Sequence, residues 1–141
     1  VFHCSECGRS SPVKRVKVSR EKFPDWKLFM LQRQFNDQTL LEGAEDMEMY
    51  SSPLNDFMDT ANLIEAMDLV ISVDTSVMHL AGAMNKPTIG LLSARTDPRW
   101  TIDMNWYPSI EFLQQTWEHD YADPWKDVFK ELVKKLGDTN E

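Results

Sequence analysis

One short stretch of the chain, residues 69–83, most constrains the fold. The largely apolar, β-branched run 69–73 stops at Asp74-Thr75-Ser76, and a helix-forming run follows at once. A buried strand, a tight turn and a helix start in direct succession are typical of an open α/β sheet, where ligands bind outside the carboxyl ends of the strands. The first turn of a helix offers unpaired N–H groups and the positive end of the helix dipole. The junction therefore predicts a site for an anion such as phosphate.

Strands and helices alternate along most of the chain. Strands are expected at 12–18, 27–32, 47–50, 69–73, 88–92 and 110–113, and helices at 36–43, 59–67, 75–84 and 124–136. In the last helix, Asp123 is the expected N-cap and Gly137 the expected stop. The alternation predicts an α/β fold, a Rossmann-like, doubly wound and mostly parallel sheet.

The length of 141 residues suits one domain with a single core. We expect a basic N-terminal leader with a weak first strand at residues 1–22. The Rossmann-like domain then spans residues 23–137, and residues 138–141 form a tail.

The net charge of the chain indicates which kinds of partner it can bind. A formal net charge of −8 argues against a nucleic-acid partner, because binding to backbone phosphates needs surplus Lys and Arg. The basic residues crowd the N-terminal leader, where we interpret them as a solvated face. No apolar run is long enough to span a bilayer and no signal peptide is visible, so we expect a cytoplasmic protein. A removed signal stays an alternative, since the chain begins at Val1 rather than Met.

Two cysteines, Cys4 and Cys7, stand in a C-x-x-C motif preceded by His3. The motif is half of a zinc ribbon, and no second C-x-x-C follows, so four ligands within one chain would need the distant His79 or His119. A redox motif belongs at the start of a helix that follows a strand, and this segment lacks that pattern. We therefore favour a leader with reduced thiols and expect no metal centre; Cys4 and Cys7 are the weak candidates for one.

The junction after residue 73 brings together side chains suited to phosphate and sugar. Asp74 can cap the helix, accept a hydrogen bond from a sugar hydroxyl or bind a metal, and Thr75 and Ser76 offer hydroxyl and N–H groups to phosphate oxygens. His79 follows one helical turn later on the same face and can donate to a second phosphate. Taken one at a time, these residues are explained by an ordinary N-cap and a packed histidine. Because all of them meet at one strand–helix junction, we favour a binding site. No G-x-S-x-G, Walker lysine loop or G-x-G-x-x-G is present.

The residues 56–64 and 68–83 together resemble the C-terminal half of GT-B glycosyltransferases. They are most similar to the lipopolysaccharide heptosyltransferases of glycosyltransferase family 9 and to related proteins that carry tetratricopeptide repeats. Further matches follow in the family's order at Lys86-Pro87, Leu91-Leu92, Arg99-Trp100, Trp106-Tyr107-Pro108-Ser109 and Asp123-Pro124-Trp125. The resemblance covers roughly residues 23–136.

The resemblance implies that this domain binds a nucleoside-diphosphate sugar and needs no further cofactor. The family's Asp-Thr-small-x-x-His motif holds the diphosphate and the sugar of the donor. By that match, Asp74 would contact the sugar or ribose, and Thr75, Ser76 and His79 would bind phosphate.

A weaker match places Gln32 and Arg33 at the end of an earlier strand that lines the donor pocket. The family also has an N-terminal domain that binds the acceptor and supplies the base, and this sequence contains no match to it. We therefore expect a donor-binding domain of a glycosyltransferase that is inactive without an acceptor domain.

The alternative function is that of a non-catalytic remnant with a GT-B half fold, acting as an interaction module. The expected partners are a nucleotide sugar and either a second copy of this chain or a separate acceptor-domain chain. The aromatic segment 100–107 could form such a contact or pack into the core.

Overall fold

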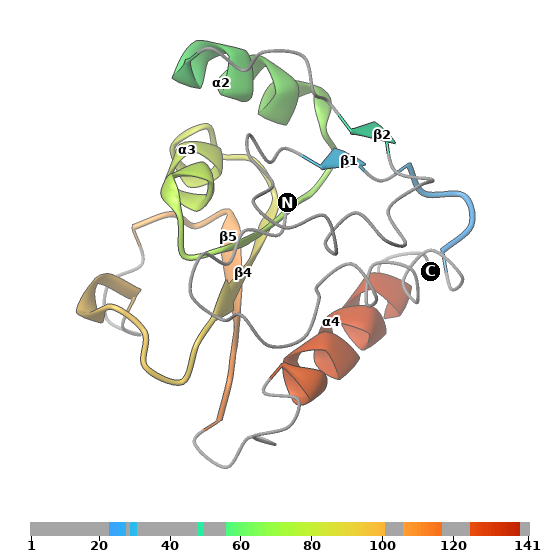
Figure 1. Ribbon diagram of the computed structural model, residues 1–141, viewed down its shortest axis with the longest axis vertical. Coiled ribbons are helices and arrows are strands. Elements are labelled where there is room, and N and C mark those ends of the chain that lie inside the picture. The colour runs from blue at the N-terminus through green and yellow to red at the C-terminus, as the bar shows by residue number, and fades with distance from the viewer. Residues whose placement is uncertain are drawn as a thin grey trace.

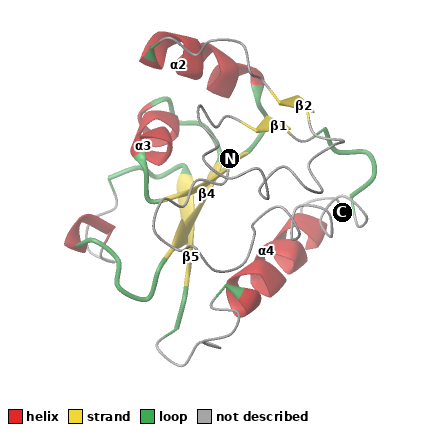
Figure 2. Cartoon of the chain, viewed as in Figure 1, coloured by secondary structure: helices red, strands yellow, loops and turns green. Residues whose placement is uncertain are grey.

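The computed structural model describes residues 23–27, 29–30, 48–49, 56–100, 106–116 and 125–138 (Figure 1). The helices and strands alternate along these residues (Figure 2). In chain order they are β1 (Phe29–Met30), β2 (Glu48–Met49), α2 (Phe57–Ala66), β3 (Val70–Val73), α3 (Ser76–Ala83), β4 (Thr88–Leu92), the 3-10 turn η2 (Pro98–Trp100), β5 (Ile110–Gln114) and α4 (Lys126–Asp138). The predicted α/β fold is confirmed. The strand expected at 12–18, the helix expected at 36–43 and the Asp123 cap lie outside the described residues.

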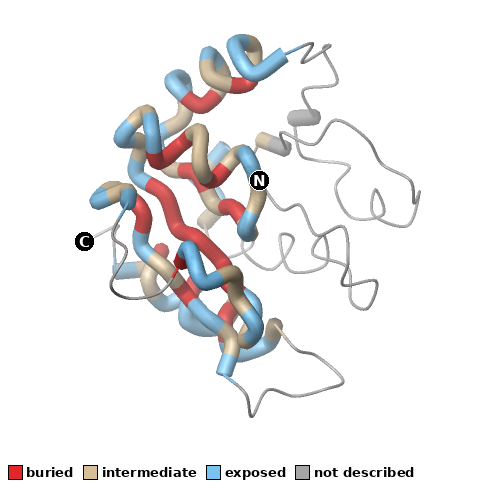
Figure 3. Tube along the Cα trace, turned by 90° about the vertical axis from the view of Figure 1, so that its left-hand side faces the viewer, coloured by how far each residue is buried: buried red, intermediate tan, exposed pale blue. Residues whose placement is uncertain are grey.

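The strands among the described residues form two parallel sheets. β1 pairs with β2, and β3, β4 and β5 form a three-stranded sheet in that order. β4 lies between its two neighbours and is buried along its whole length, as the continuous red run in Figure 3 shows. In β3 buried and half-buried residues alternate. Within the described sheet, β4 is therefore the central strand.

Helices cover both faces of the three-stranded sheet (Figure 1). On one face Val128, Leu132 and Leu136 of α4 pack against apolar residues of β4 and β5. On the other face α2 and α3 form the core with residues from all three strands and from η2. These opposite-face residues are Ile64, Val70, Met78, Ala81, Leu92, Trp100 and Ile110. Such two-sided packing is the doubly wound arrangement expected from the sequence.

Local capping explains where two helices differ from the expected bounds. α2 begins before the predicted residue 59, because the Asp56 carboxylate accepts hydrogen bonds from the N–H groups of Met58 (2.9 Å) and Asp59 (3.0 Å). α4 continues through Gly137, which was the predicted stop, to Asp138. Gly137 does not take the left-handed backbone conformation that makes glycine a C-terminal cap.

α3 ends in a Schellman motif that turns the chain into β4. Asn85 has a left-handed backbone with φ 53°, and its N–H donates to the Gly82 carbonyl at 3.0 Å. The N–H of Lys86 donates to the Ala81 carbonyl at 3.0 Å, which completes the pair of bonds that defines the motif. No helix in the described part of the chain is long and apolar enough to cross a membrane.

Two glycines provide a matched test of the packing. A Cβ on Gly90 in β4 would lie 2.7 Å from a ring carbon of Phe112 and 2.8 Å from the Met78 sulfur, whereas a Cβ on Gly137 would meet nothing within 4 Å. We expect Gly90→Ala to lower the free energy of unfolding by about 1–3 kcal/mol through overpacking. Gly137→Ala should raise it by up to about 1 kcal/mol through helix propensity. Denaturant unfolding of both variants checks this, and equal effects of the same sign would contradict the described packing.

Candidate functional site

The junction between β3 and α3 consists of Asp74 and Thr75. Thr75 is the N-cap of α3, with an extended backbone (φ −146°, ψ 170°), but its side chain makes no capping hydrogen bond. Its Oγ1 lies 3.2 Å from the Oγ of Ser72, a buried residue of β3. Because the Ser72 hydroxyl donates its one hydrogen to the Val73 carbonyl (2.9 Å), Thr75 is the donor in the pair of hydroxyls. The Thr75 side chain is thereby held against the strand and turned away from the helix end.

The amino end of α3 is consequently uncapped. The first helical hydrogen bonds run from the N–H groups of Met78 (3.0 Å) and His79 (3.4 Å) to the Thr75 carbonyl. The N–H groups of Ser76 and Val77 precede these bonds, and no described residue accepts from them. α2 differs, because the Asp56 carboxylate occupies the equivalent place at its amino end. α3 thus presents two unpaired donors and the positive end of its dipole.

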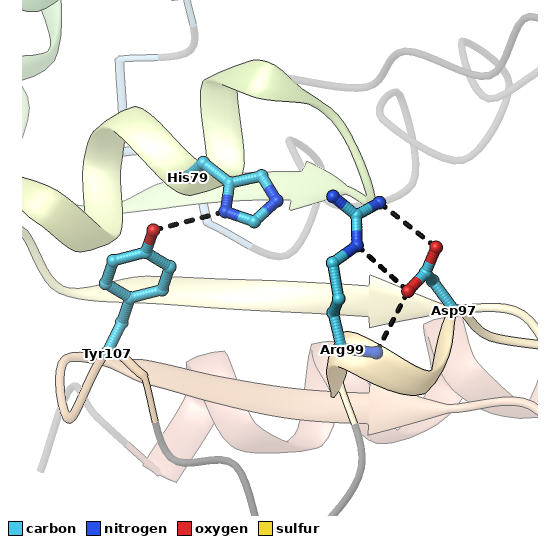
Figure 4. Close-up of polar contacts among 4 residues, drawn as sticks. All are labelled: His79, Asp97, Arg99 and Tyr107. Atoms are coloured by element: carbon cyan, nitrogen blue, oxygen red, sulfur yellow. Dashed lines mark hydrogen bonds and ion pairs between the residues drawn. The ribbon is translucent and has the colours of Figure 1, made fainter.

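Polar side chains surround this helix end. Asp74 and Ser76 are exposed, and their side chains make no hydrogen bond with another described residue. His79 is half-buried, and its Nδ1 lies 3.2 Å from the hydroxyl of Tyr107 (Figure 4). Its ring also packs on Trp100, with a centroid distance of 4.6 Å and an interplanar angle of 33°.

The connection that follows β4 adds a cation. The Asp97 carboxylate binds Arg99 three times, at Nε (2.9 Å), at Nη2 (3.1 Å) and at the backbone N–H (2.9 Å). Figure 4 shows the Arg99 guanidinium extending from η2 toward the end of β3, on the side to which the second ring nitrogen of His79 points. Asp97 fixes the guanidinium by a two-pronged contact.

Electrostatic coupling supports this proximity. The hydrogen bonds from Arg99 hold the pKa of Asp97 below its ordinary value of 3.8, with a smaller lowering from the charge of His79. The hydrogen bond and charge of Asp97 raise the pKa of Arg99, and the charge of Asp74 contributes to the same rise. In both cases the contact between Asp97 and Arg99 is the main cause of the pKa shift, and the charges of His79 and Asp74 contribute least.

The structure describes four of the predicted site residues. Asp74, Thr75, Ser76 and His79 lie together at the carboxyl end of β3, as their spacing implies. Gln32, Arg33, Cys4 and Cys7 lie outside the described residues. Within the described ranges, no group of three or more His, Cys, Asp or Glu side chains is placed to hold a metal ion.

Sequence reasoning did not assign Arg99 or Tyr107 to the site. Both belong to the connection 93–109, whose local signals were its richness in Arg, Asp and Trp and the family matches that include Arg99 and Tyr107. A topological signal was also present, because connections that leave the carboxyl ends of neighbouring parallel strands meet at one edge of the sheet. By this rule, the connection after β4 is expected near the β3–α3 junction.

The Asp97–Arg99 contact predicts a titration. Because the folded pKa of Asp97 is depressed, its stabilising contribution is present above the ordinary value of 3.8 and is lost as the pH falls through the lowered folded value. We expect the Asp97 carboxyl to titrate below 3.8, and Arg99→Gln to move it back toward 3.8. Carboxyl-detected NMR measures both, with Lys134→Gln on α4 as the control for loss of a distant charge. An Asp97 titration that is the same with and without Arg99 would contradict the contact.

Comparison with known proteins places the chain in a family. The model of glycosyltransferase family 9 (heptosyltransferase) matches residues 38–132. The putative lipopolysaccharide heptosyltransferase 4 of Escherichia coli (strain K12) is 32% identical over 75 residues, which are 50% of this chain and 21% of that relative. The chain thus spans about a fifth of the curated relative, and no solved structure matches it. Since the family model covers well over half of the chain, including the β3–α3 junction, the chain belongs to glycosyltransferase family 9.

Proposed function

We propose that the β3–α3 junction binds the diphosphate of a nucleotide-sugar donor and that the chain is a donor-binding part of a glycosyltransferase. The observation that carries the proposal is the uncapped amino end of α3, with His79 and Arg99 beside it. Helix amino ends of this kind bind phosphate through backbone N–H groups and the dipole. Membership of family 9 supports a sugar-transfer reaction, and the name of the bacterial relative makes heptose the first sugar to test.

Each group at the junction has a distinct role in the proposed complex. The N–H groups of Ser76 and Val77 donate to one phosphate, and the second ring nitrogen of His79 donates to the next. Arg99 supplies a charge-assisted hydrogen bond from the opposite side. The exposed carboxylate of Asp74 would repel phosphate, so it accepts instead from hydroxyl groups of the sugar or the ribose.

The same groups would favour the transfer step. The bond between the sugar and the diphosphate breaks, and the electron pair stays on the departing phosphate oxygen. The acceptor oxygen forms the new glycosidic bond and loses its proton to a base. The helix dipole, His79 and Arg99 are aimed at the departing diphosphate, where negative charge develops, and such preorganised charge lowers the barrier without requiring a metal. Acceptor binding and the base belong to a part of the enzyme outside this site, so we expect binding without transfer from this chain alone.

Calorimetry with a panel of ADP-, UDP- and GDP-sugars tests the proposal. At least one donor should bind, and His79→Ala should weaken it by about tenfold, the worth of one charged hydrogen bond. Arg99→Gln should cost about threefold to tenfold, because this side chain is 59% exposed and its charge is screened.

Lys134→Gln provides the matched control, since it removes a charge from an exposed position of α4 on the other face of the sheet. It should leave the affinity unchanged. Affinities no tighter than about 1 mM for every donor, or wild-type affinity in His79→Ala, would overturn the proposal.

A second candidate function, association with another chain, rests on Trp106. This side chain is 60% exposed, whereas Trp100 in the same aromatic segment is buried at 6% and belongs to the core. A large exposed aromatic side chain is typical of contact surfaces. Light scattering separates the two functions, because a strict monomer that binds a nucleotide sugar removes this second candidate.

A further inference from the structure

We propose that Tyr107 is a positioning residue of the donor site: its hydroxyl donates a hydrogen bond to Nδ1 of His79 and so keeps the proton of the neutral imidazole on Nε2. The two atoms lie 3.2 Å apart, although the two residues are 28 positions apart in the sequence. In Figure 4 the other ring nitrogen points away from Tyr107, toward Arg99 and the end of β3. This inference rests on the proposed function, because it assigns His79 the state in which it can donate to phosphate.

The position of Tyr107 depends on a glycine in α3. A Cβ on Gly82 would lie 2.4 Å from Cγ and 2.8 Å from Cβ of Tyr107. Gly82 follows His79 by three residues and so lies on the same face of the helix, and it is buried. Because this position has no side chain, the Tyr107 ring can lie against α3 with its hydroxyl at the imidazole. The Tyr107 carbonyl also accepts from the Ile110 N–H at 3.0 Å, which fixes the residue at the start of β5.

The imidazole ring is held on two sides. Trp100 packs on it at 4.6 Å between centroids, and the Tyr107 ring meets it edge-on at 5.8 Å and 77°. Trp100 is itself buried and packs on Phe112 of β5 at 5.4 Å. With the ring plane fixed by these neighbours, the nitrogen that carries the proton is linked to whether the Tyr107 hydroxyl donates or accepts.

The direction of the hydrogen bond follows from what each group can do. A neutral imidazole has one donor nitrogen and one acceptor nitrogen. If His79 donated from Nδ1, its Nε2 would present a lone pair to the site, and phosphate oxygens offer only lone pairs. If Tyr107 donates, Nε2 carries the hydrogen and faces the junction as a donor. Of the two neutral forms of the ring, only the second agrees with diphosphate binding.

Nitrogen NMR of the histidine ring in the ligand-free chain tests the inference directly. At a pH where the ring is neutral, His79 should be protonated on Nε2, with its Nδ1 signal shifted by an accepted hydrogen bond. Tyr107→Phe removes one oxygen atom and should abolish that shift. Trp106→Phe, a change in the exposed neighbouring aromatic, should leave it unchanged. A proton on Nδ1 in the wild type, or an unchanged Nδ1 signal in Tyr107→Phe, would overturn the inference.

A double-mutant cycle in donor binding distinguishes positioning from general structural support. Tyr107→Phe should weaken the best-binding nucleotide sugar by about fivefold, the effect of one neutral hydrogen bond. In the His79→Ala background the same change should have no measurable effect. An equal loss in both backgrounds would overturn the positioning role. If no nucleotide sugar binds the wild type, the proposed function fails, and with it the role in donor binding, while the NMR signal still decides whether Tyr107 orients His79.

Discussion

The parallel pairing of β3, β4 and β5 is the constraint on which the rest of the structure depends. Val73, Leu91 and Leu113 lie in register across the three strands, so the strands reach the same edge of the sheet. β4 is buried along its length between α4 on one face and α3 on the other, and apolar burial of this extent is the main stabilising term in a small domain. The loops that leave this edge therefore start from fixed positions at the ends of the strands.

The proposed site depends on this arrangement of the three strands. One half of the proposed site comes from the β3–α3 junction and the other from the connection between β4 and β5. The junction contributes unpaired N–H groups, and the connection contributes Arg99 together with Trp100 and Tyr107, which contact the His79 imidazole. Two small residues, Ser72 and Gly82, allow the groups of the junction and of the connection to lie together. Ser72 binds the Thr75 hydroxyl and leaves the helix uncapped, and Gly82 makes room for the Tyr107 ring.

Most of the fold could be predicted from local sequence. The strand at 88–92 was assigned with its observed bounds, because its apolar run is bordered by Pro87 and Ser93. Helix ends were less predictable, since α2 begins where a carboxylate caps it and α4 passes through Gly137. Asp74 to His79 are close in sequence and could be found as a motif. Tyr107 meets His79 only through tertiary packing, and no spacing rule within the chain reports such a contact.

The central claim is that the uncapped amino end of α3 binds the diphosphate of a donor. Titration of the nitrogen-labelled chain with a nucleoside diphosphate, followed by amide NMR, tests it most directly. The account predicts that the amide signals of Ser76 and Val77 shift most and saturate together, while those of Met58 and Asp59, already bound by Asp56 at the start of α2, stay in place. Unchanged signals at Ser76 and Val77, or equal shifts at the two helix ends, would contradict it.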